Sequence, residues 1–397
     1  MLEHTLKAIK GAGIEEVVMT VHYMKEAIMS KFGDGSSLGL RITYAEQVDL
    51  LGTGHALKVV QPYLGNERFL LVYGDLAFNP SLLKRMLSEE EGANGAANQG
   101  GAILGVSVDD ISEYGSLMMS GDRLESIKEK PTHGRRGVIN GGIYILQPSI
   151  FACVDETPVS ERSEIELTSS INLALSKGIR FRVHLTDTAQ WVDVGRPWNL
   201  LEANRILMDA LVTESRIEGE VEEGATIHGN VVVERGASVL SGSYIEGPVW
   251  VSSGCKVGPN CYLRPYTYLC RGAKVGHACE IKASIIMEDS RVGHLSYLGD
   301  SIIGSGSNIG AGTITANLRF DEGPVGAFIK GKRVSSGRKK LGAFLGDCVK
   351  TGINVSISPG VKVGYGSWIS PHTALDRDVP PGMLVSERRL FEMHKRR

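Results

Sequence analysis

From Val221 to Ile281, an aliphatic residue recurs at every sixth position. A helix cannot explain this spacing, because six residues turn a helix by about 600° and the apolar face would move around its axis. A single strand cannot explain it either, because strands rarely exceed about 10 residues. A coil built from short strands and tight turns fits both facts, so the spacing predicts a parallel β-helix of hexapeptide repeats. The frame consists of Val221, Ile227, Val233, Val239, Ile245, Val251, Val257, Leu263, Leu269, Val275 and Ile281.

The repeat shifts register and is then interrupted before it resumes. It slips by one residue to Ile286, Val292 and Leu298, and again to Ile303 and Ile309. It resumes at Leu345 and continues through Ile357, Val363, Ile369 and Leu375. Glycine supplies the turns that such coils require, since 49 of the 397 residues are glycine, about 12% against a usual 7% or so. We expect residues 315–344 to leave the coils as a loop, where repeat proteins often carry function.

Residues 1–212 have a different sequence pattern, in which helix-like and strand-like runs alternate. Helical spacing occurs over 2–13 and 25–33, and strand-like runs occur over 15–21, 40–47, 68–75, 101–108 and 141–146. Nearly continuous apolar runs suit strands covered on both faces, so this half predicts an α/β domain with a mostly parallel sheet. The polar run 89–101 predicts a flexible loop. A helix over 200–212 is expected to join the two domains, 1–212 and 213–397.

Composition excludes several classes of partner. Lys and Arg total 43 and Asp and Glu total 45, for a formal net charge of −2, so no bulk positive field attracts nucleic acid or an anionic membrane. No run of about 18 uncharged apolar residues predicts a membrane-spanning helix. The N-terminus also lacks the basic-then-apolar order of a signal peptide. We expect a cytoplasmic protein that binds neither nucleic acid nor membrane.

The six cysteines are expected to be reduced, small, buried residues. None forms a CxxC pair, and a chain of this length and composition is no disulfide-rich mini-domain. Metal binding is the alternative interpretation. The cysteines are Cys153, Cys255, Cys261, Cys270, Cys279 and Cys348.

Three segments of the C-terminal half resemble one group of acyltransferases. They are EIKAS (280–284), GHLSYLGDS (293–301) and SNIGAGTITANL (307–318). These residues resemble the left-handed β-helix acyltransferases, and among them the bifunctional N-acetylglucosamine-1-phosphate uridylyltransferase/glucosamine-1-phosphate acetyltransferase family. The segment KTGINVSISPGVKVG (350–364) resembles the archaeal-type branch of that family.

The N-terminal half resembles the sugar-1-phosphate nucleotidylyltransferases, which have a Rossmann-like α/β domain. The resemblance lies in LGTGHAL (51–57), VYGD (72–75), KEKP (128–131), INGGIYIL (139–146) and WVDVGRPWNLLEAN (191–204). That family opens with a strand and a glycine-rich phosphate loop, for which this sequence has no counterpart. We therefore expect an N-terminally incomplete domain with unpaired strand edges and a weakened nucleotide site. A protein with a vestigial first domain is the alternative.

The resemblance implies roles at an acetyl-transfer site. His294 would be the base, since a neutral imidazole can take a proton near pH 7, and Asn317 would lie beside the base and the acyl acceptor. The backbone N–H of Ala311 would face the thioester oxygen of acetyl-CoA. The residues implied to contact the sugar and its phosphate are Arg264, Lys282, Tyr297 and Asn308.

The resemblance also implies a nucleotide-transfer site that uses Mg²⁺. Transfer from a nucleoside triphosphate to a sugar 1-phosphate needs a metal to neutralise charge, and Mg²⁺ takes one or two carboxylates plus phosphates. Asp75 and Asp193 are the implied ligands. The segment implied to read the base contributes Gln47, Gly52 and Thr53. The implied sugar and phosphate contacts are Glu129, Lys130, Asn140 and Gly142.

Together these features predict a homotrimeric enzyme of UDP-N-acetylglucosamine synthesis, in which nucleotide transfer is the weaker activity. One alternative is a thymidylyl- or guanylyltransferase with a purely structural β-helix. Another is a non-catalytic regulatory subunit. The basic residues within 319–340 could bind the phosphates of CoA or form a solvated hairpin. The sequence leaves open the nucleotide base and the preferred amino sugar.

Overall fold

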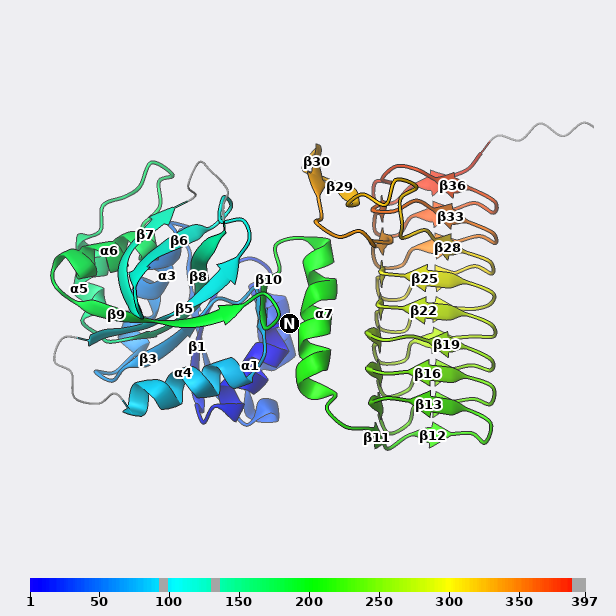
Figure 1. The fold of residues 1–397 in the computed structure, drawn as a ribbon, viewed down its shortest axis with the longest axis horizontal. Coiled ribbons are helices and arrows are strands. Elements are labelled where there is room, and N and C mark those ends of the chain that lie inside the picture. The colour runs from blue at the N-terminus through cyan, green and yellow to red at the C-terminus, as the bar shows by residue number, and fades with distance from the viewer. Residues whose placement is uncertain (93–98, 130–135, 388–397) are drawn as a thin grey trace, which may run out of the picture. The chain divides into compact units, whose positions relative to one another are not determined.

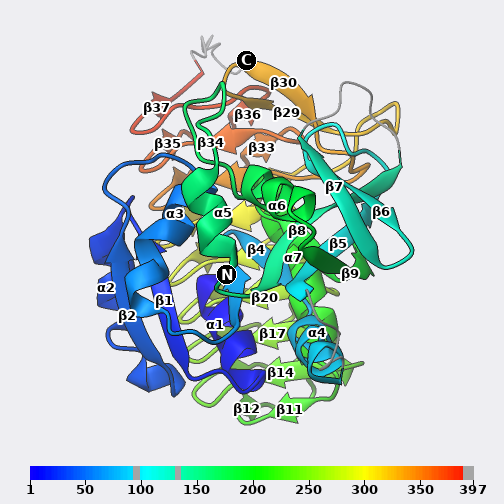
Figure 2. The same ribbon diagram turned by 90° about the vertical axis from the view of Figure 1, so that its left-hand side faces the viewer.

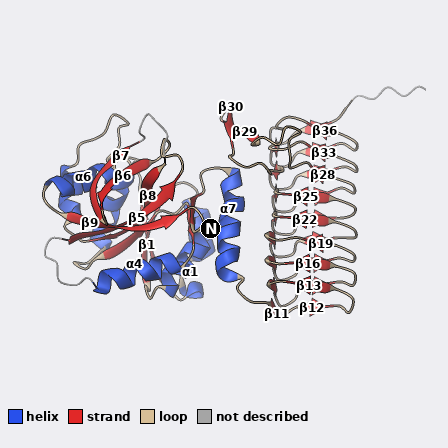
Figure 3. Cartoon of the chain, in the orientation of Figure 1, coloured by secondary structure: helices blue, strands red, loops and turns tan. Residues whose placement is uncertain are grey.

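The chain consists of two compact units, Met1–Val194 and Gly195–Arg397 (Figure 1). The computed structural model describes residues 1–92, 99–129 and 136–387. The sequence analysis places the domain boundary after residue 212, and the difference is the helix α7 (Pro197–Leu211), which groups with the second unit. Figure 3 shows the contrast in secondary structure, with strands and turns alone in the described part of the chain after α7. Within the described ranges, no helix combines the length and the apolar character needed to cross a membrane.

The first unit is an α/β domain, as predicted. Its helices are α1 (Leu2–Gly11), α2 (Lys25–Phe32), α3 (Thr53–Val60), α4 (Ser81–Gly92), α5 (Ile150–Glu156) and α6 (Leu167–Ser176), with 3₁₀ turns η1 (Ser36–Leu38) and η2 (Gln61–Tyr63). Its main sheet has the order β3 (Phe69–Val72), β8 (Gly137–Leu146), β5 (Gln99–Val108), β9 (Arg180–Asp187), β7 (Arg123–Glu129) and β6 (Gly115–Ser120). Two smaller sheets pair β1 (Glu16–Val21) with β2 (Arg41–Glu46) and β4 (Leu76–Phe78) with β10 (Trp191–Asp193).

The expectation of a mostly parallel sheet is wrong. Strands β3, β5 and β9 share one direction, but β8 runs antiparallel between β3 and β5, and β7 is antiparallel to both β9 and β6. The apolar runs instead reflect cover on both faces of the sheet. Ile103 of β5 packs in a cluster with α5 and α6, whereas its neighbour Leu104 packs in a cluster with α1 and α4. Cover of this kind requires apolar residues on both faces whatever the direction of the strand.

The predicted loop over 89–101 is also partly wrong. Residues 89–92 end α4, residues 99–101 begin β5, and residues 93–98 lie outside the described part of the chain. Glu90 is buried against the sheet, where its carboxylate contacts the imidazole of His184 at 3.1 Å and the guanidinium of Arg182 at 3.2 Å. These partners explain why a polar run continues the helix.

Strands β1 and β3 each have one hydrogen-bonding neighbour among the described strands. Strand β1 pairs only with β2, and β3 pairs only with β8. All four residues of β3 are half-buried, whereas Ile143 and Tyr144 of the neighbouring β8 are fully buried. The apolar strand β3 therefore keeps one edge without a hydrogen-bonding strand.

The second unit is the predicted parallel β-helix, whose coils contribute short strands to three sheets. Sheet I contains β11 (Arg216–Ile217), β14 (Val231–Val233), β17 (Val249–Val251), β20 (Thr267–Leu269), β23 (Ile285–Ile286), β26 (Ile302–Ile303), β31 (Phe344–Leu345) and β34 (Lys362–Val363). Sheet II contains β12 (Glu220–Val221), β15 (Ser238–Val239), β18 (Lys256–Val257), β21 (Lys274–Val275), β24 (Arg291–Val292), β27 (Asn308–Ile309), β32 (Lys350–Thr351), β35 (Trp368–Ile369) and β37 (Leu384–Val385). Sheet III contains β13 (Thr226–His228), β16 (Tyr244–Glu246), β19 (Tyr262–Leu263), β22 (Glu280–Lys282), β25 (Tyr297–Gly299), β28 (Ile314–Thr315), β33 (Ser356–Ile357) and β36 (Ala374–Leu375). Figure 2 shows β11, β14, β17 and β20 one above another.

The predicted aliphatic frame fills the interior of the β-helix. Its members from Val233 to Ile309 are at most 2% exposed, and those from Leu345 to Leu375 are also buried. Val221 departs from the prediction and is 36% exposed, because it lies in the first coil and has no preceding coil to cover it. The core thus follows the repeat, including its two slips.

Sheet I is covered on its outer face by residues of the same unit. Met208 and Val212 at the end of α7 pack on Val232, and Trp198 and Leu201 near its start pack in a cluster with sheet-I residues. The outer face of sheet I therefore belongs to the core of the second unit, whereas sheets II and III keep exposed outer faces.

The predicted break in the coils is a β-hairpin. Strands β29 (Gly326–Ile329) and β30 (Lys332–Ser335) pair antiparallel, and Val325 and Leu341 beside them pack with the apolar residues that cover sheet I. The hairpin leaves the coils after β28 and returns before β31. Of the two interpretations for residues 319–340, the hairpin is confirmed, and binding of CoA stays a prediction.

Five of the six cysteines are buried as predicted, and all six are free thiols. Cys348 is the exception, because it lies at an exposed corner before β32 with a left-handed backbone (φ +58°). Burial raises the pKa of Cys255 and Cys270 to about 12 and that of Cys261 to about 11. Since the thiolate is the reactive form, these buried thiols should be inert in the folded chain.

We therefore expect one thiol per chain to react with an aromatic disulfide reagent at pH 8, and six after denaturation in guanidinium. Absorbance of the released thiolate measures both numbers. The Cys348→Ser variant should show none in the native state and five when unfolded. A second fast thiol in the native variant would contradict the packing described above.

Candidate functional site

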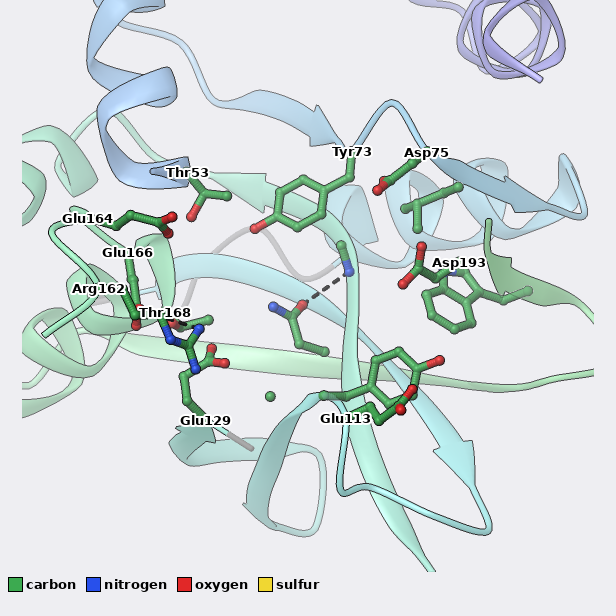
Figure 4. A pocket seen from close by; sticks show the side chains of 16 residues that line it. Thr53, Tyr73, Asp75, Glu113, Glu129, Arg162, Glu164, Glu166, Thr168 and Asp193 are labelled. Atoms are coloured by element: carbon green, nitrogen blue, oxygen red, sulfur yellow. Dashed lines mark hydrogen bonds and ion pairs between the residues drawn. The ribbon is translucent and has the colours of Figure 1, made fainter. Parts of the chain in front are cut away.

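The first candidate site is a pocket of about 290 Å³ in the first unit (Figure 4). It lies where β3 and β10 end, where β4 begins, and along β8 and the start of α3. It is lined by Thr53, Tyr73, Asp75, Leu76, Glu113, Tyr114, Gly115, Glu129, Asn140, Gly142, Arg162, Glu164, Glu166, Thr168, Trp191 and Asp193. The pocket therefore contains both predicted metal ligands and three of the predicted sugar contacts. The fourth, Lys130, lies outside the described residues.

The predicted metal ligands are brought together by the pairing of β4 with β10. Asp193 lies opposite Leu76, the residue after Asp75, and the Val194 N–H donates to the Asp75 carbonyl at 3.0 Å. Both carboxylates face the pocket in Figure 4. No group of three metal-ligating side chains occurs in the described residues. Two carboxylates beside a cavity nevertheless fit Mg²⁺, which takes its remaining ligands from phosphates and water.

The predicted base-reading segment is only partly at the pocket. Thr53 lines it, and its Oγ1 accepts a hydrogen bond from the Leu167 N–H at 3.0 Å. Gln47 is buried, and its Nε2 donates to the Gly52 carbonyl at 3.1 Å, so its side chain holds the loop. Gly52 has φ +94°, and a Cβ there would lie 2.8 Å from Glu164 Cβ. Neither Gln47 nor Gly52 belongs to the pocket lining.

Asn140 and Gly142 shape the pocket wall that β8 provides. The Asn140 Oδ1 accepts from the Gly142 N–H at 3.1 Å, and its Nδ2 donates to the Tyr144 hydroxyl at 2.5 Å. Gly142 has φ +68°, and a Cβ there would lie 2.8 Å from the Tyr73 ring. Burial raises the pKa of both Tyr73 and Tyr144, so both phenols stay protonated at neutral pH. This wall is neutral and fixed by its own hydrogen bonds.

Arg162 is a functional candidate that the sequence analysis missed. The pocket is lined by six carboxylates, and Arg162 is the one Lys or Arg among the described lining residues. It pairs with Glu166 at 3.7 Å. The signal was the charged run 161–166 between α5 and α6, which carries both signs over six residues. A guanidinium in an acidic pocket can hold a phosphate in place.

The second candidate site lies on sheet III of the β-helix. Arg264 follows β19, Lys282 ends β22 and Tyr297 begins β25, so three predicted side chains come from successive coils. Asn317 follows β28 in the next coil. Adjacent coils pair as parallel strands about 4.8 Å apart, so side chains far apart in the sequence are stacked as neighbours. The structure thus brings together Arg264, Lys282, Tyr297 and Asn317.

Hydrogen bonds fix this group. Arg264 Nη1 donates to Glu280 Oε1 at 2.9 Å, while its Nε is buried and has no partner among the described residues. Asn317 Nδ2 donates to the Tyr297 hydroxyl at 3.1 Å. Burial, together with the nearby Asp300 carboxylate, raises the pKa of Tyr297, which therefore stays neutral. The group presents two cations, a phenol and an amide on one face.

His294 and Ala311 lie at the corner between sheets II and III. His294 is exposed in the turn between β24 and β25, and its carbonyl accepts from the Gly312 N–H at 3.1 Å. This bond stacks the Ala311 turn directly on the His294 turn. Asn308 is also exposed, but it lies in sheet II between Arg291 and Lys350. The predicted acetyl-transfer residues are therefore divided between sheet III, the corner and sheet II.

Comparison with known proteins matches both units. The nucleotidyl transferase family model matches residues 1–210, and a model described as the GMPPB C-terminal domain matches residues 245–339. A bifunctional sugar-1-phosphate nucleotidylyltransferase/acetyltransferase of Sulfurisphaera tokodaii is 41% identical over 384 residues, 96% of this chain and 91% of that protein. The bifunctional protein GlmU of Methanocaldococcus jannaschii is 39% identical over 393 residues, 98% of this chain and 90% of that protein.

A match to a single-function relative is shorter. A glucose-1-phosphate thymidylyltransferase of Streptomyces antibioticus is 32% identical over 240 residues, 60% of this chain and 65% of that protein. The thymidylyltransferase alternative is therefore supported over only part of the chain.

The first unit is an α/β domain with a carboxylate-lined pocket, and the second is a hexapeptide β-helix with a group of polar side chains on sheet III. Together they define the chain as a bifunctional transferase. The relatives match along nearly their whole lengths. The chain belongs to the family of bifunctional sugar-1-phosphate nucleotidylyltransferases/acetyltransferases, and it is an enzyme.

Proposed function

We propose that the chain acetylates glucosamine 1-phosphate with acetyl-CoA and transfers a uridylyl group from UTP to N-acetylglucosamine 1-phosphate. The observation that carries this proposal is the stack of Arg264, Lys282, Tyr297 and Asn317 on sheet III beside the His294 corner. A β-helix that served only to hold subunits together would not need this polar group. The product is UDP-N-acetylglucosamine, and the proposed location of both reactions is the cytoplasm.

His294 accepts the proton that the amino group loses when it attacks the thioester. The carbonyl oxygen becomes negative in this step, and the Ala311 backbone N–H donates to it. The tetrahedral intermediate then collapses, the bond between carbonyl carbon and sulfur breaks, and the sulfur takes up the proton held by His294, so that CoA leaves as the thiol. Arg264 and Lys282 hold the sugar phosphate, and Asn308 contacts the sugar.

The division of these residues between two sheets supports a homotrimer. Sheet I is covered by α7 and the hairpin segment, so only sheets II and III can face neighbouring chains. Both expose large apolar side chains, such as Trp368 at 54% on sheet II and Tyr244 at 42% on sheet III. A closed ring of three β-helices covers these faces and brings Asn308 of one chain towards sheet III of the next.

The nucleotide site uses the pocket of the first unit. Asp75 and Asp193 would hold Mg²⁺, which neutralises triphosphate charge when bound. Glu129 and Asn140 contact the sugar, and Arg162 is placed for its phosphate. Lys130, which lies outside the described residues, keeps the role of a phosphate contact that the family resemblance implies. Thr53, at the start of α3, is the proposed contact to the nucleotide base, with Gln47 holding the loop behind it.

Arg162 gives a direct test of the pocket. Replacing Arg162 with alanine should raise the KM for the sugar 1-phosphate about ten-fold, because a charged hydrogen-bond donor to phosphate is lost. Pyrophosphate release measures the reaction, and KM for the nucleoside triphosphate should change less. Arg180→Ala, an exposed arginine outside the pocket, is the matched control. An equal change in both variants would remove Arg162 from the site.

The acetylation assay tests the proposal as a whole. Release of CoA from acetyl-CoA is followed by thiol titration, with glucosamine 1-phosphate and galactosamine 1-phosphate as alternative acceptors. The Cys348→Ser background removes the exposed protein thiol. Release with glucosamine 1-phosphate by a trimer, sized by light scattering, supports the proposal. Release only with galactosamine 1-phosphate would change the sugar, and no release with either would overturn acetylation.

A further inference from the structure

A buried carboxylate stands at the centre of the sheet-III group without a predicted role. Asp300 follows β25 at the corner between sheets III and I, and its side chain is 4% exposed. Its backbone is left-handed, with φ +50°. The Asp300 N–H donates to the Lys282 carbonyl, and the Asp300 carbonyl accepts from the Gly342 N–H, both at 2.9 Å. These two backbone hydrogen bonds hold the main chain of Asp300 in place, independently of the contacts that its side chain makes.

Three side chains from separate segments converge on this carboxylate. Lys282 Nζ lies 3.0 Å from Oδ2, and Asn317 Nδ2 donates to the same oxygen at 2.6 Å. Arg338 Nη2 lies 3.6 Å from Oδ1. Lys282 comes from the coil before Asp300 and Asn317 from the coil after it, whereas Arg338 comes from the segment that follows the hairpin. A fully buried anion is tolerated because these donors surround it.

The chemistry of Asp300 determines which way the Asn317 amide points. A carboxylate only accepts hydrogen bonds, so the amide nitrogen must face it. The second N–H of that nitrogen is taken by the Tyr297 hydroxyl at 3.1 Å. The Asn317 oxygen has no hydrogen-bond partner among the described residues and is turned away from Asp300. It is therefore presented as an acceptor, which is what an attacking amine requires.

Asp300 also determines where two cations stand. Lys282 and Arg338 contact different oxygens of one carboxylate, so their charges are held side by side. The other end of the Arg338 fork donates to Glu202 of α7 at 3.1 Å. Both cations remain partly exposed, at 20% and 28%, and keep donors for a ligand. A phosphate group is the ligand that suits two adjacent cations.

We propose that Asp300 is the positioning residue of the acetyl-transfer site, which turns the Asn317 oxygen towards the amine and pairs Lys282 with Arg338 as the grip on the sugar phosphate. This inference rests on the proposed acetylation of a sugar phosphate. It adds Arg338 to the residues that contact the sugar phosphate. It also explains why a carboxylate lies beside the phosphate site, since Asp300 holds the two cations that bind the phosphate.

The test compares Asp300→Asn with Asp289→Asn in the Cys348→Ser background. Asp289 lies at a different corner, between sheets I and II, and is also left-handed at φ +57°, but it is exposed and outside the group. Asparagine tolerates this backbone, so both variants should fold. Asp300→Asn should lower kcat/KM for glucosamine 1-phosphate by about 10- to 100-fold, since a charged hydrogen-bonded centre is lost. Asp289→Asn should stay within about two-fold.

Two further variants separate positioning from a structural role. The swap Asp300→Asn with Asn317→Asp rebuilds the amide–carboxylate pair in the opposite direction and again presents an oxygen to the amine. It should recover at least about ten-fold of the lost kcat/KM. Arg338→Ala should raise KM for glucosamine 1-phosphate about ten-fold while KM for acetyl-CoA and kcat stay unchanged. Thermal unfolding of each variant, followed by circular dichroism, confirms that it folds.

The outcomes are distinct. Asp300→Asn with nearly wild-type kcat/KM, or a swap no better than the single variant, would overturn the positioning role. If the wild-type chain releases no CoA, the proposed acetylation fails, and calorimetric binding of glucosamine 1-phosphate then tests the positioning alone. Binding about ten-fold weaker in Asp300→Asn would support it, and equal binding would overturn it. Absence of binding by the wild-type chain would overturn both.

Discussion

Replacing His294 with alanine should lower acetyl transfer by about 100- to 10,000-fold, the usual loss when a general base is removed. The side chain is exposed at the corner between sheets II and III, so the β-helix loses no core contact and the proposed trimer should persist. Release of CoA at saturating glucosamine 1-phosphate measures the loss. The decrease should fall on kcat, because the imidazole acts on the attacking amine and not on the phosphate.

The matched control is His277→Ala. His277 lies at the same corner one coil earlier, where its carbonyl accepts from the Leu295 N–H at 3.0 Å, and it is also exposed. It should retain activity within about two-fold, since a surface change away from a site has little effect. Unchanged turnover in His294→Ala would remove His294 as the base. Equal losses in both variants would point to the corner as a structural element.

Replacing Asp75 with asparagine should lower pyrophosphate release by at least about 100-fold, because the proposed metal site loses one of its two carboxylates. The change preserves the size of the side chain and leaves the pairing of β4 with β10 intact. Higher Mg²⁺ concentration should recover part of the rate. Removal of the metal with a chelator should stop the wild-type reaction and leave acetyl transfer unaffected.

Asp109→Asn is the control, an exposed carboxylate that follows β5 outside the pocket. Unchanged pyrophosphate release by Asp75→Asn would contradict the assignment of Asp75 as a metal ligand. If the wild-type chain releases no measurable pyrophosphate, turnover does not distinguish the two variants. Titration with Mn²⁺, followed by electron spin resonance, would then compare metal binding by the two variants directly.

Much of the second unit could be predicted from sequence, because each coil repeats one local rule. An inward aliphatic side chain at every sixth position specifies the interior even through its register slips, as Ile286 and Ile303 show. The first unit was less predictable. Its apolar runs indicated cover on both faces, but they carry no information about strand direction, so the antiparallel insertion of β8 was missed.

The candidate sites divide in the same way. The sequence singles out His294 and Asn317 because they lie within long segments that resemble one family, and their roles stay predictions. Asp300 lies in the same segment as His294, but its proposed role depends on contacts with Lys282, Asn317 and Arg338. Only the stacking of coils and the return of the hairpin bring these three residues to it. Contacts of this kind leave no periodic trace in the sequence.

The helix α7 packs across several coils of the β-helix and should hold them together. In a solenoid each coil contacts only its neighbouring coils. Local unfolding should therefore begin at an end and proceed one coil at a time. Because α7 bridges from Val232 to Ile302 on sheet I, such fraying should stop before the coils it spans. Hydrogen exchange should therefore be fast in β35 and β36 and slow in β22 and β25. The proposed acetyl-transfer site lies within the coils that α7 spans, so it should keep its shape while the C-terminal coils open and close.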